Sequence, residues 1–208
     1  AGFQAEFNDN INLSATDPRS DLSLGPTVGM GFILPLTKEH LLQMDVGMGY
    51  RWYLNSPPLN SLTLAPNSRL DYRMFVGNLS LNFHDSFTMQ NDPVSRPELT
   101  GGKNQYIDFR RFHNTIGVIA EWRAFRQWAF IAGYDFGLDR SLSSDFLNLD
   151  DNQHNFSLGT YYQLSSRLNV GINSSYSLNL YRDSNQNDGD STTVGPFVSW
   201  EVNRYITL

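Results

Sequence analysis

The sequence contains no cysteine, and this absence removes several kinds of chemistry at once. Without thiols the chain forms no disulfide framework, no thiolate metal site and no cysteine nucleophile. It also lacks an apolar run of about 18 residues, which a transmembrane helix requires. Lysine is scarce, since the 15 basic residues include only Lys38 and Lys103 as lysines. No basic stripe is present, so the sequence predicts no nucleic-acid partner.

Aromatic residues are abundant, at 13% of the chain, although the net charge is -6 and the mean hydropathy is -0.39. In "LLQMDVGMGYRWYL", residues 41–54, a large apolar side chain stands at every second position. Successive side chains of a strand point to opposite faces, so this segment has one apolar face and one small or polar face. Transmembrane β-barrels show this alternation, which keeps their mean hydropathy low.

The same alternation recurs along the chain and predicts ten strands. They cover residues 3–13, 22–34, 42–54, 61–76, 79–87, 116–122, 128–138, 156–164, 168–180 and 194–202. In the fourth strand Pro66 either forms a bulge or places a turn at Ala65–Ser68. "RYITL" at residues 204–208 begins an eleventh strand. Because bacterial single-chain barrels generally have an even number of strands, we expect an incomplete sequence and at least twelve strands in the whole protein.

Short and long connections alternate strictly between these strands. The short ones are 37–40, 77–78, 124–127, 165–166 and 203–204, and the long ones are 15–21, 55–61, 91–104, 140–152 and 183–190. Such alternation is expected of an up-and-down barrel with tight turns at one end. We therefore predict an all-β fold, a transmembrane up-and-down antiparallel β-barrel that forms a single domain over residues 1–208.

Three features indicate that the apolar face meets lipid. Most strands are longer than the roughly 5–6 residues usual in globular proteins. The opposite face is rich in Gly, Asn and Ser, and the aromatic residues fall at strand ends, where membrane interfaces lie. The interface aromatics that we predict are Tyr50, Trp52, Trp122, Trp128, Tyr162, Trp200 and Tyr205. The alternative is a soluble β-protein, in which the apolar face would be the core.

Two segments carry a resemblance to a known family. "RMFVGNLSLNFHDSFTMQNDP", residues 73–93, and "RRFHNTIGVIAEW", residues 110–122, together with GxxY strands such as 47–50, resemble the β-barrel porin family of bacterial outer membranes. The resemblance implies an outer-membrane location and a diffusion role, and it brings no catalytic residues. In that location we expect the N-terminus and the short turns to be periplasmic and the long loops extracellular.

Charged residues recur on the polar face of the predicted strands. The predicted lumen-facing set is Asp45, Arg51, Arg69, Asp71, Arg73, Glu121, Arg123, Asp135 and Asp139. Mixed charges inside a pore tune ion or solute selectivity. The alternative is that they pair with one another and brace the wall, because small barrels fill their interiors with side chains.

Two acidic residues have the parity of the lipid face. Asp9 stands between Phe7 and Ile11, and Asp85 stands between Phe83 and Phe87. A charge costs free energy there, so each position indicates a bulge, a place near the headgroups, or a wall covered by another protein or protomer. His84 and Asp85 are adjacent in a strand and point to opposite faces, so they form no dyad.

The loops contain weak signals for chemistry. "RDSNQNDGDS", residues 182–191, has alternating oxygen ligands, but its glycine is displaced from the EF-hand spacing and no Glu closes the loop. The loop "SSDFLNLDDNQH" holds Asp150, Asp151 and His154, a set that fits either a metal ion or the acid–His pair of an outer-membrane protease. We expect no metal, no cofactor and no enzymatic activity.

The function that these features predict is a porin-like passive channel for small polar solutes or ions. The first alternative is a scaffold barrel that docks or houses another envelope protein, and the second is a hydrolase with its site in the long loops. The expected partners are the lipid bilayer with its outer-membrane lipids, and either an envelope protein or further copies of the chain.

Overall fold

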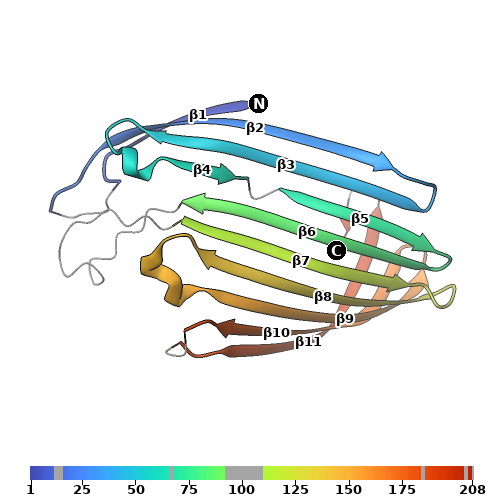
Figure 1. The fold of residues 1–208 in the computed structure, drawn as a ribbon. Coiled ribbons are helices and arrows are strands. Elements are labelled where there is room, and N and C mark those ends of the chain that lie inside the picture. Colours follow the sequence, from blue (N-terminus) through green and yellow to red (C-terminus); the bar gives the residue numbers. More distant parts are fainter. Residues whose placement is uncertain (12–15, 66–67, 92–109, 184–185, 204–205, 208) are drawn as a thin grey trace.

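The computed structural model describes the chain except for residues 12–15, 66–67, 92–109, 184–185, 204–205 and 208. Its strands form one sheet in the order β1-β2-β3-β4-β6-β7-β8-β9-β10-β11-β12, with β5 paired to β3 and β6 (Figure 1). The strands are β1 (Gly2–Asn8), β2 (Asp21–Pro35), β3 (His40–Tyr53), β4 (Ser61–Leu64), β5 (Arg69–Val76), β6 (Leu79–Asn91), β7 (Arg110–Trp122), β8 (Trp128–Ser141), β9 (Asp151–Ser165), β10 (Leu168–Tyr181), β11 (Gly189–Asn203) and β12 (Ile206–Thr207). Two 3-10 helices, η1 (Pro57–Leu59) and η2 (Ser144–Leu149), lie in connections. Among the described residues, no helix is long and apolar enough to cross a membrane.

The predicted up-and-down antiparallel topology is confirmed. Apart from β4 and β5, which do not pair with each other, every strand pairs antiparallel with its sequence neighbours, because alternating tight turns and longer loops return the chain beside the strand just formed. The turn between β5 and β6 is tight, and Gly77 has φ 59°, a left-handed conformation that glycine adopts without steric cost. No pairing joins β1 to β11 or β12 in the described chain, so these strands form a curved wall with two free edges.

The predicted fourth strand is present but broken into β4 and β5, and both pieces pair with β3 and β6. Ser68 bridges the break: its Oγ donates to the Gly47 carbonyl at 3.2 Å and accepts from the Gly47 amide at 3.0 Å. Proline has no amide hydrogen for the ladder, which accounts for an interruption at this point of the sequence. Pro66 itself lies outside the described residues.

The first strand is shorter than the predicted range of 3–13, because β1 ends at Asn8. Ile11 lies in the connection that follows, where it is 4% exposed and packs with Tyr53 and Leu59. Asp9 therefore does not stand on the wall between Phe7 and Ile11, since it follows the end of the strand. The alternation in the sequence assigned Ile11 to the strand, although this residue belongs to the loop and packs on Tyr53 and Leu59.

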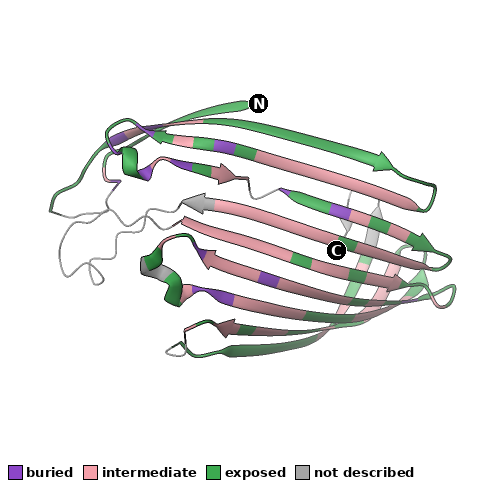
Figure 2. Ribbon diagram, in the orientation of Figure 1, coloured by how far each residue is buried: buried purple, intermediate pink, exposed green. Residues whose placement is uncertain are grey.

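Burial is concentrated at the end of the sheet that carries the long loops (Figure 2). Ile11, Tyr53 and Leu59 are buried there, together with polar groups such as Asp21 and Asp150. Along the strands, by contrast, Trp52 and Trp122 are each 53% exposed. A soluble sandwich would bury such side chains in a core, so the apolar face of this sheet has the exposure expected of a wall in lipid.

Candidate functional site

The polar face of the sheet brings the predicted charged residues together in rows. Asp45 stands opposite Arg69 in the β3–β5 pair. The next row runs Gln43, Asp71, His84, Gly117 and Asp135 across five strands. Because paired residues share a face of the sheet, all of these side chains project to the same side.

Three contacts on this face join residues two strands apart. Arg51 Nη1 lies 3.8 Å from Glu6 Oε2 across β2, His84 Nε2 lies 2.7 Å from Asp135 Oδ1 across β7, and the Tyr161 hydroxyl donates to Glu121 Oε1 at 2.9 Å across β8. Strands two apart are separated by about 9.5 Å, so these side chains meet because they converge. The polar face is therefore the concave face of the curved sheet, the side that corresponds to a barrel lumen.

Gly117 creates the room for the His84–Asp135 contact. It stands between these two residues in the row, and a Cβ added there would lie 2.7 Å from His84 Nε2 and closer still to Asp135 Oδ1. Any larger residue would occupy the space in which the imidazole and the carboxylate meet. The sequence gives no hint of this pairing, since 51 residues separate His84 from Asp135.

Most of the predicted lumen charges are paired along the wall. Arg69 Nε lies 3.2 Å from Asp71 Oδ2 and 3.7 Å from Asp45 Oδ2, and Asp71 is buried. Arg123 Nε lies 3.0 Å from Glu121 Oε1 near the short-turn end. Arg73 differs, because it is exposed on the polar face and no ion pair within the described residues engages it. The paired residues are thus candidates for bracing the wall, and Arg73 is a candidate for ion selectivity.

The apolar face carries two bands of aromatic side chains. At the short-turn end Trp128 contacts Tyr162 with ring centroids 5.0 Å apart, and Trp122 contacts Phe130 at 6.0 Å. Toward the loop end Tyr134 contacts Phe156 at 4.9 Å. Residues 128 and 134 are six positions apart on one strand, or about 20 Å at 3.3 Å per residue. Rings at two such levels are typical of membrane–water interfaces.

The remaining predicted interface aromatics are placed as follows. Tyr50, Trp52 and Trp200 are exposed on β3 and β11, and Tyr205 lies outside the described residues. Asp85 lies on the apolar face, where its Oδ1 accepts from Asn114 Nδ2 at 2.5 Å. The β6–β7 register runs unbroken past it, so no bulge explains its position. A contact of this residue with headgroups or with another protein stays a prediction.

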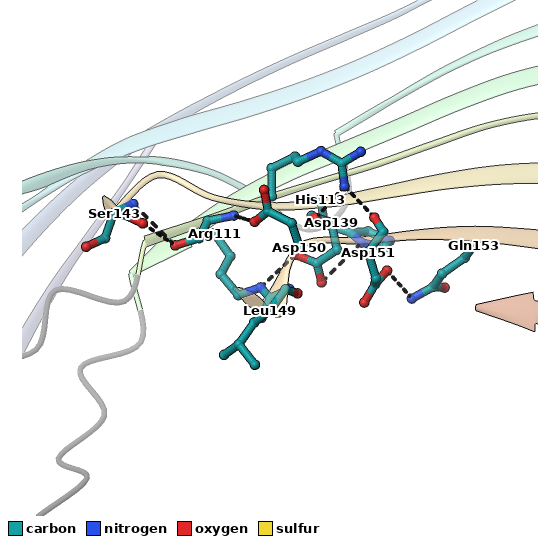
Figure 3. Close-up of polar contacts among 10 residues, drawn as sticks. Arg111, His113, Asp139, Ser143, Leu149, Asp150, Asp151 and Gln153 are labelled. Carbon is teal, nitrogen blue, oxygen red and sulfur yellow. Dashed lines mark hydrogen bonds and ion pairs between the residues drawn. The ribbon is translucent and has the colours of Figure 1, made fainter. Parts of the chain in front are cut away.

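A second polar cluster lies at the loop end of β7, β8 and β9 (Figure 3). Arg111 Nε donates to Asp139 Oδ1 at 2.6 Å, and its Nη2 donates to the Leu149 carbonyl at 3.0 Å. His113 Nδ1 lies 3.9 Å from Asp139 Oδ2, beyond hydrogen-bond distance. Asp151 is the direct cross-strand partner of Asp139. We call Arg111, His113, Asp139 and Asp151 the rim cluster.

Asp151 is the first residue of β9 and lies beyond both aromatic bands. Burial raises the pKa of its carboxyl above the ordinary value; the hydrogen bond from Gln153 Nε2, at 3.3 Å, lowers this pKa, and the Asp139 charge raises it. The rim cluster thus combines an arginine-paired carboxylate, a neighbouring carboxyl whose pKa is raised, and an imidazole. Such a set binds polar or cationic groups and provides an acid and a base within one region.

Asp150, which stands beside this cluster, has a structural role. Its carboxylate is 1% exposed, Oδ1 accepts from the Ser141 amide at 2.8 Å, and Oδ2 lies 3.7 Å from Arg182 Nη1. It thus ties the end of β8 to the start of β9 and to the end of β10.

Replacement of Asp150 by alanine is expected to lower the free energy of unfolding by about 1–3 kcal/mol, because it leaves the buried Ser141 amide without an acceptor. Denaturant titration of the protein in detergent measures this change. Asp188→Ala is the matched control, since Asp188 accepts the same kind of bond from the Tyr181 amide at 2.9 Å but is exposed. Equal losses in the two variants would contradict the role of burial.

The acid–His set predicted from the loop, Asp150, Asp151 and His154, is not brought together. His154 pairs with Phe136 and its Nδ1 contacts the Tyr134 hydroxyl at 3.0 Å, which places it on the apolar face. Asp151 lies on the opposite face, because three positions separate the two residues in one strand. Sequence proximity brought them into one hypothesis, and strand alternation separates them.

Several polar-face residues were not predicted from the sequence as residues of the wall. They are Glu6, His84, Arg111, His113, Tyr161 and Asp151, the last of which the sequence placed only in the loop set. For Glu6, His84 and Tyr161 a signal was present, because each has the parity of polar or small residues on its strand. Arg111, His113 and Asp151 lie outside the predicted strands, so the alternation assigned no face to them.

Comparison with known proteins supports the fold. No family model matches the chain, and no curated protein matches it. Two solved structures of OmpT, an outer membrane protein of Vibrio cholerae, are similar to it. The trimer form has a TM-score of 0.53 at 9% identity over 99% of this chain and 82% of that one, and the second structure has 0.51 at 10% over 97% and 80%. The chain therefore has the fold of outer-membrane β-barrel proteins, and the predicted fold class is confirmed.

These neighbours also correct one expectation. The sequence led us to expect a chain that is not an enzyme, and that conclusion does not stand, because the fold shared with the two OmpT structures serves channels and enzymes alike. At 9–10% identity the likeness shows the fold and leaves the chemistry to the residues of the site. The porin family named by the sequence resemblance is not matched by any family model.

Proposed function

We propose that the chain forms the wall of a porin-like channel of the bacterial outer membrane, through which small polar solutes or ions pass. The observation that carries the proposal is the set of contacts across an intervening strand, Glu6–Arg51, His84–Asp135 and Glu121–Tyr161. These contacts are evidence that the polar face is concave, so that charged and amide side chains line the inside while the aromatic bands face lipid. This is the arrangement of a water-filled barrel.

In this proposal the short turns and the N-terminus are periplasmic and the long loops extracellular. The paired charges, such as Arg69 with Asp45 and Asp71, brace the wall, and Arg73, which no ion pair among the described residues engages, acts on passing ions. The trimer form of one neighbour supports assembly of several copies in the same membrane, with Asp85 as a candidate contact.

The test is reconstitution of the full chain in a planar bilayer with potassium chloride on both sides. We expect stepwise increases in current as single molecules insert. Insertion is verified separately by protease protection in vesicles. Inserted protein that produces no steps would overturn the channel proposal.

The rim cluster favours a second candidate, a hydrolase with its site at the loop end. His113, Asp139 and Asp151 lie together on the concave face, where they provide a base and an acid. The loop set predicted from the sequence does not provide them, because His154 lies on the other face. Hydrolysis of a fluorogenic peptide or ester that is lost in Asp139→Asn and retained in Asp135→Asn would support this function. Activity that is absent, or equal in both variants, would overturn it.

A further inference from the structure

A hollow on the concave face lies over β8, β9, β10 and β11. The hollow has a volume of about 450 Å³, within the range of roughly 300–1,000 Å³ that is usual for ligand pockets. The residues that line it from the polar face are Ile131, Ser157, Gly159, Asn173, Ser175, Thr193, Gly195 and Phe197, so polar groups alternate with the apolar surfaces of Ile131 and Phe197. They occupy adjacent rows of the register, so the hollow is a continuous part of the wall.

Glycines give the hollow its depth. Gly171 lets the Phe197 ring lie against the sheet, since an added Cβ would be 2.5 Å from Cε1 of the ring. Gly159 does the same for the Asn173 amide, whose Oδ1 lies 2.7 Å from the position of such a Cβ. Nothing lies within 4 Å of the corresponding position at Gly195. The ring and the amide are therefore held against the wall, and the space above Gly195 is open.

The chemistry of the hollow differs from that of the rest of the concave face. The charged side chains of the polar face lie on strands from β1 to β9, whereas the polar-face positions of β10 and of β11 as far as Ser199 carry only Gly, Asn, Ser, Thr, Phe and, at the loop end, Tyr181. Within the described part of the chain, no hydrogen bond engages the side chains of Ser157, Asn173, Ser175 or Thr193. Three hydroxyls and one amide thus offer donors and acceptors of both kinds beside an aromatic ring, without a net charge.

We propose that this hollow is a subsite for neutral, polyhydroxylated solutes, of which a linear oligosaccharide is the simplest. Sugar hydroxyls need donors and acceptors in close alternation, which hydroxyl and amide groups supply. The apolar face of a sugar ring packs on an aromatic ring, and Phe197 offers one. An ion gains little here, because no charge compensates its loss of water. The inference rests on the proposed channel function, to which it adds the class of solute.

The test measures the binding of maltohexaose to the full chain refolded in detergent by isothermal titration calorimetry, and separately the block of ion current by the same sugar. We expect saturable binding with a Kd on the order of 1–10 mM, weak enough for a solute that must leave again. Gly195→Leu places a side chain in the open space, since nothing lies within 4 Å of its Cβ position, and Phe197→Ala removes the ring. Each is expected to raise the Kd about tenfold or more, and the control Val198→Ala, on the apolar face, to leave it within about twofold.

Binding that is absent in the parent chain, or equal in Gly195→Leu and the parent, would overturn the inference even where current steps occur. Saturable binding that is lost in Gly195→Leu supports the subsite even where no steps are seen, and in that case the channel proposal alone fails. The two proposals are thus separated by the two readouts. Unfolding of each variant in denaturant verifies that a loss of binding is local.

Discussion

Replacement of Gly171 by valine is expected to destabilise the sheet severely, by about 3 kcal/mol or more, at the upper end of what overpacking usually costs. A Cβ at this position would meet the Thr160 carbonyl oxygen, which belongs to the backbone of β9, and the Phe197 ring at 2.5 Å. The Phe197 ring can rotate away, but the Thr160 carbonyl cannot move without disturbing the β9–β10 ladder. The higher β-strand propensity of valine would by itself stabilise the sheet, so the expected loss arises from the steric overlap alone.

The measurement is the free energy of unfolding in detergent, accompanied by the shift in gel mobility between folded and heat-denatured protein. Gly195→Val is the matched control, because Gly195 lies on the neighbouring strand and the same face with nothing within 4 Å. We expect this control to be neutral or stabilised by up to about 1 kcal/mol. Equal stability of the two variants would show that the approach of Thr160 and Phe197 to Gly171 is not as close as described.

Replacement of Arg73 by glutamate is expected to shift the channel toward cations by about thirtyfold in the ratio of cation to anion permeability at low salt. Two unit charges about 8 Å apart in water interact by about 0.5 kcal/mol, so a change of two charges lowers the energy of a passing cation by about 1 kcal/mol and raises that of an anion by about as much. No ion pair is lost in the described structure, and the wall should therefore keep its stability. The Arg73 variant therefore tests selectivity alone. A change at Arg69 would also remove its ion pairs with Asp45 and Asp71 and so weaken the wall.

The reversal potential in a salt gradient measures this ratio. Arg126→Glu is the control, because Arg126 is exposed in the turn between β7 and β8, outside the concave face. We expect it to leave the ratio nearly unchanged, and both effects to shrink as salt is raised, since screening shortens the reach of a charge. An equal shift in both variants would mean that the turn, rather than the wall, governs selectivity.

The fold was predictable because its main determinant is local. Apolar residues at every second position, as in residues 41–54, define the two faces of a strand wherever the chain folds. The regular succession of short and long connections then leaves little choice of topology. The prediction was wrong for the end of the first strand, because Ile11 continues the alternation in sequence while its side chain covers Tyr53 and Leu59.

The candidate site was predictable only in part. Parity placed Asp45, Arg69 and Asp135 on one face, and the structure agrees. Parity did not predict the contact between His84 and Asp135. The loop hypothesis also did not recognise that His154 lies on the opposite face of the sheet from Asp151. Those facts depend on register between strands that are far apart in sequence and on the space that Gly117 leaves.

The sequence by itself thus determined the all-β fold, the order of the strands and the division into an apolar and a polar face, because a period of two is a property of each strand alone. Only the tertiary structure decided which face is concave, which charges are paired and where the wall is hollowed. Those properties arise from curvature and register, through which side chains two strands apart converge and glycines let a ring or an amide lie against the sheet. No single strand contains that information.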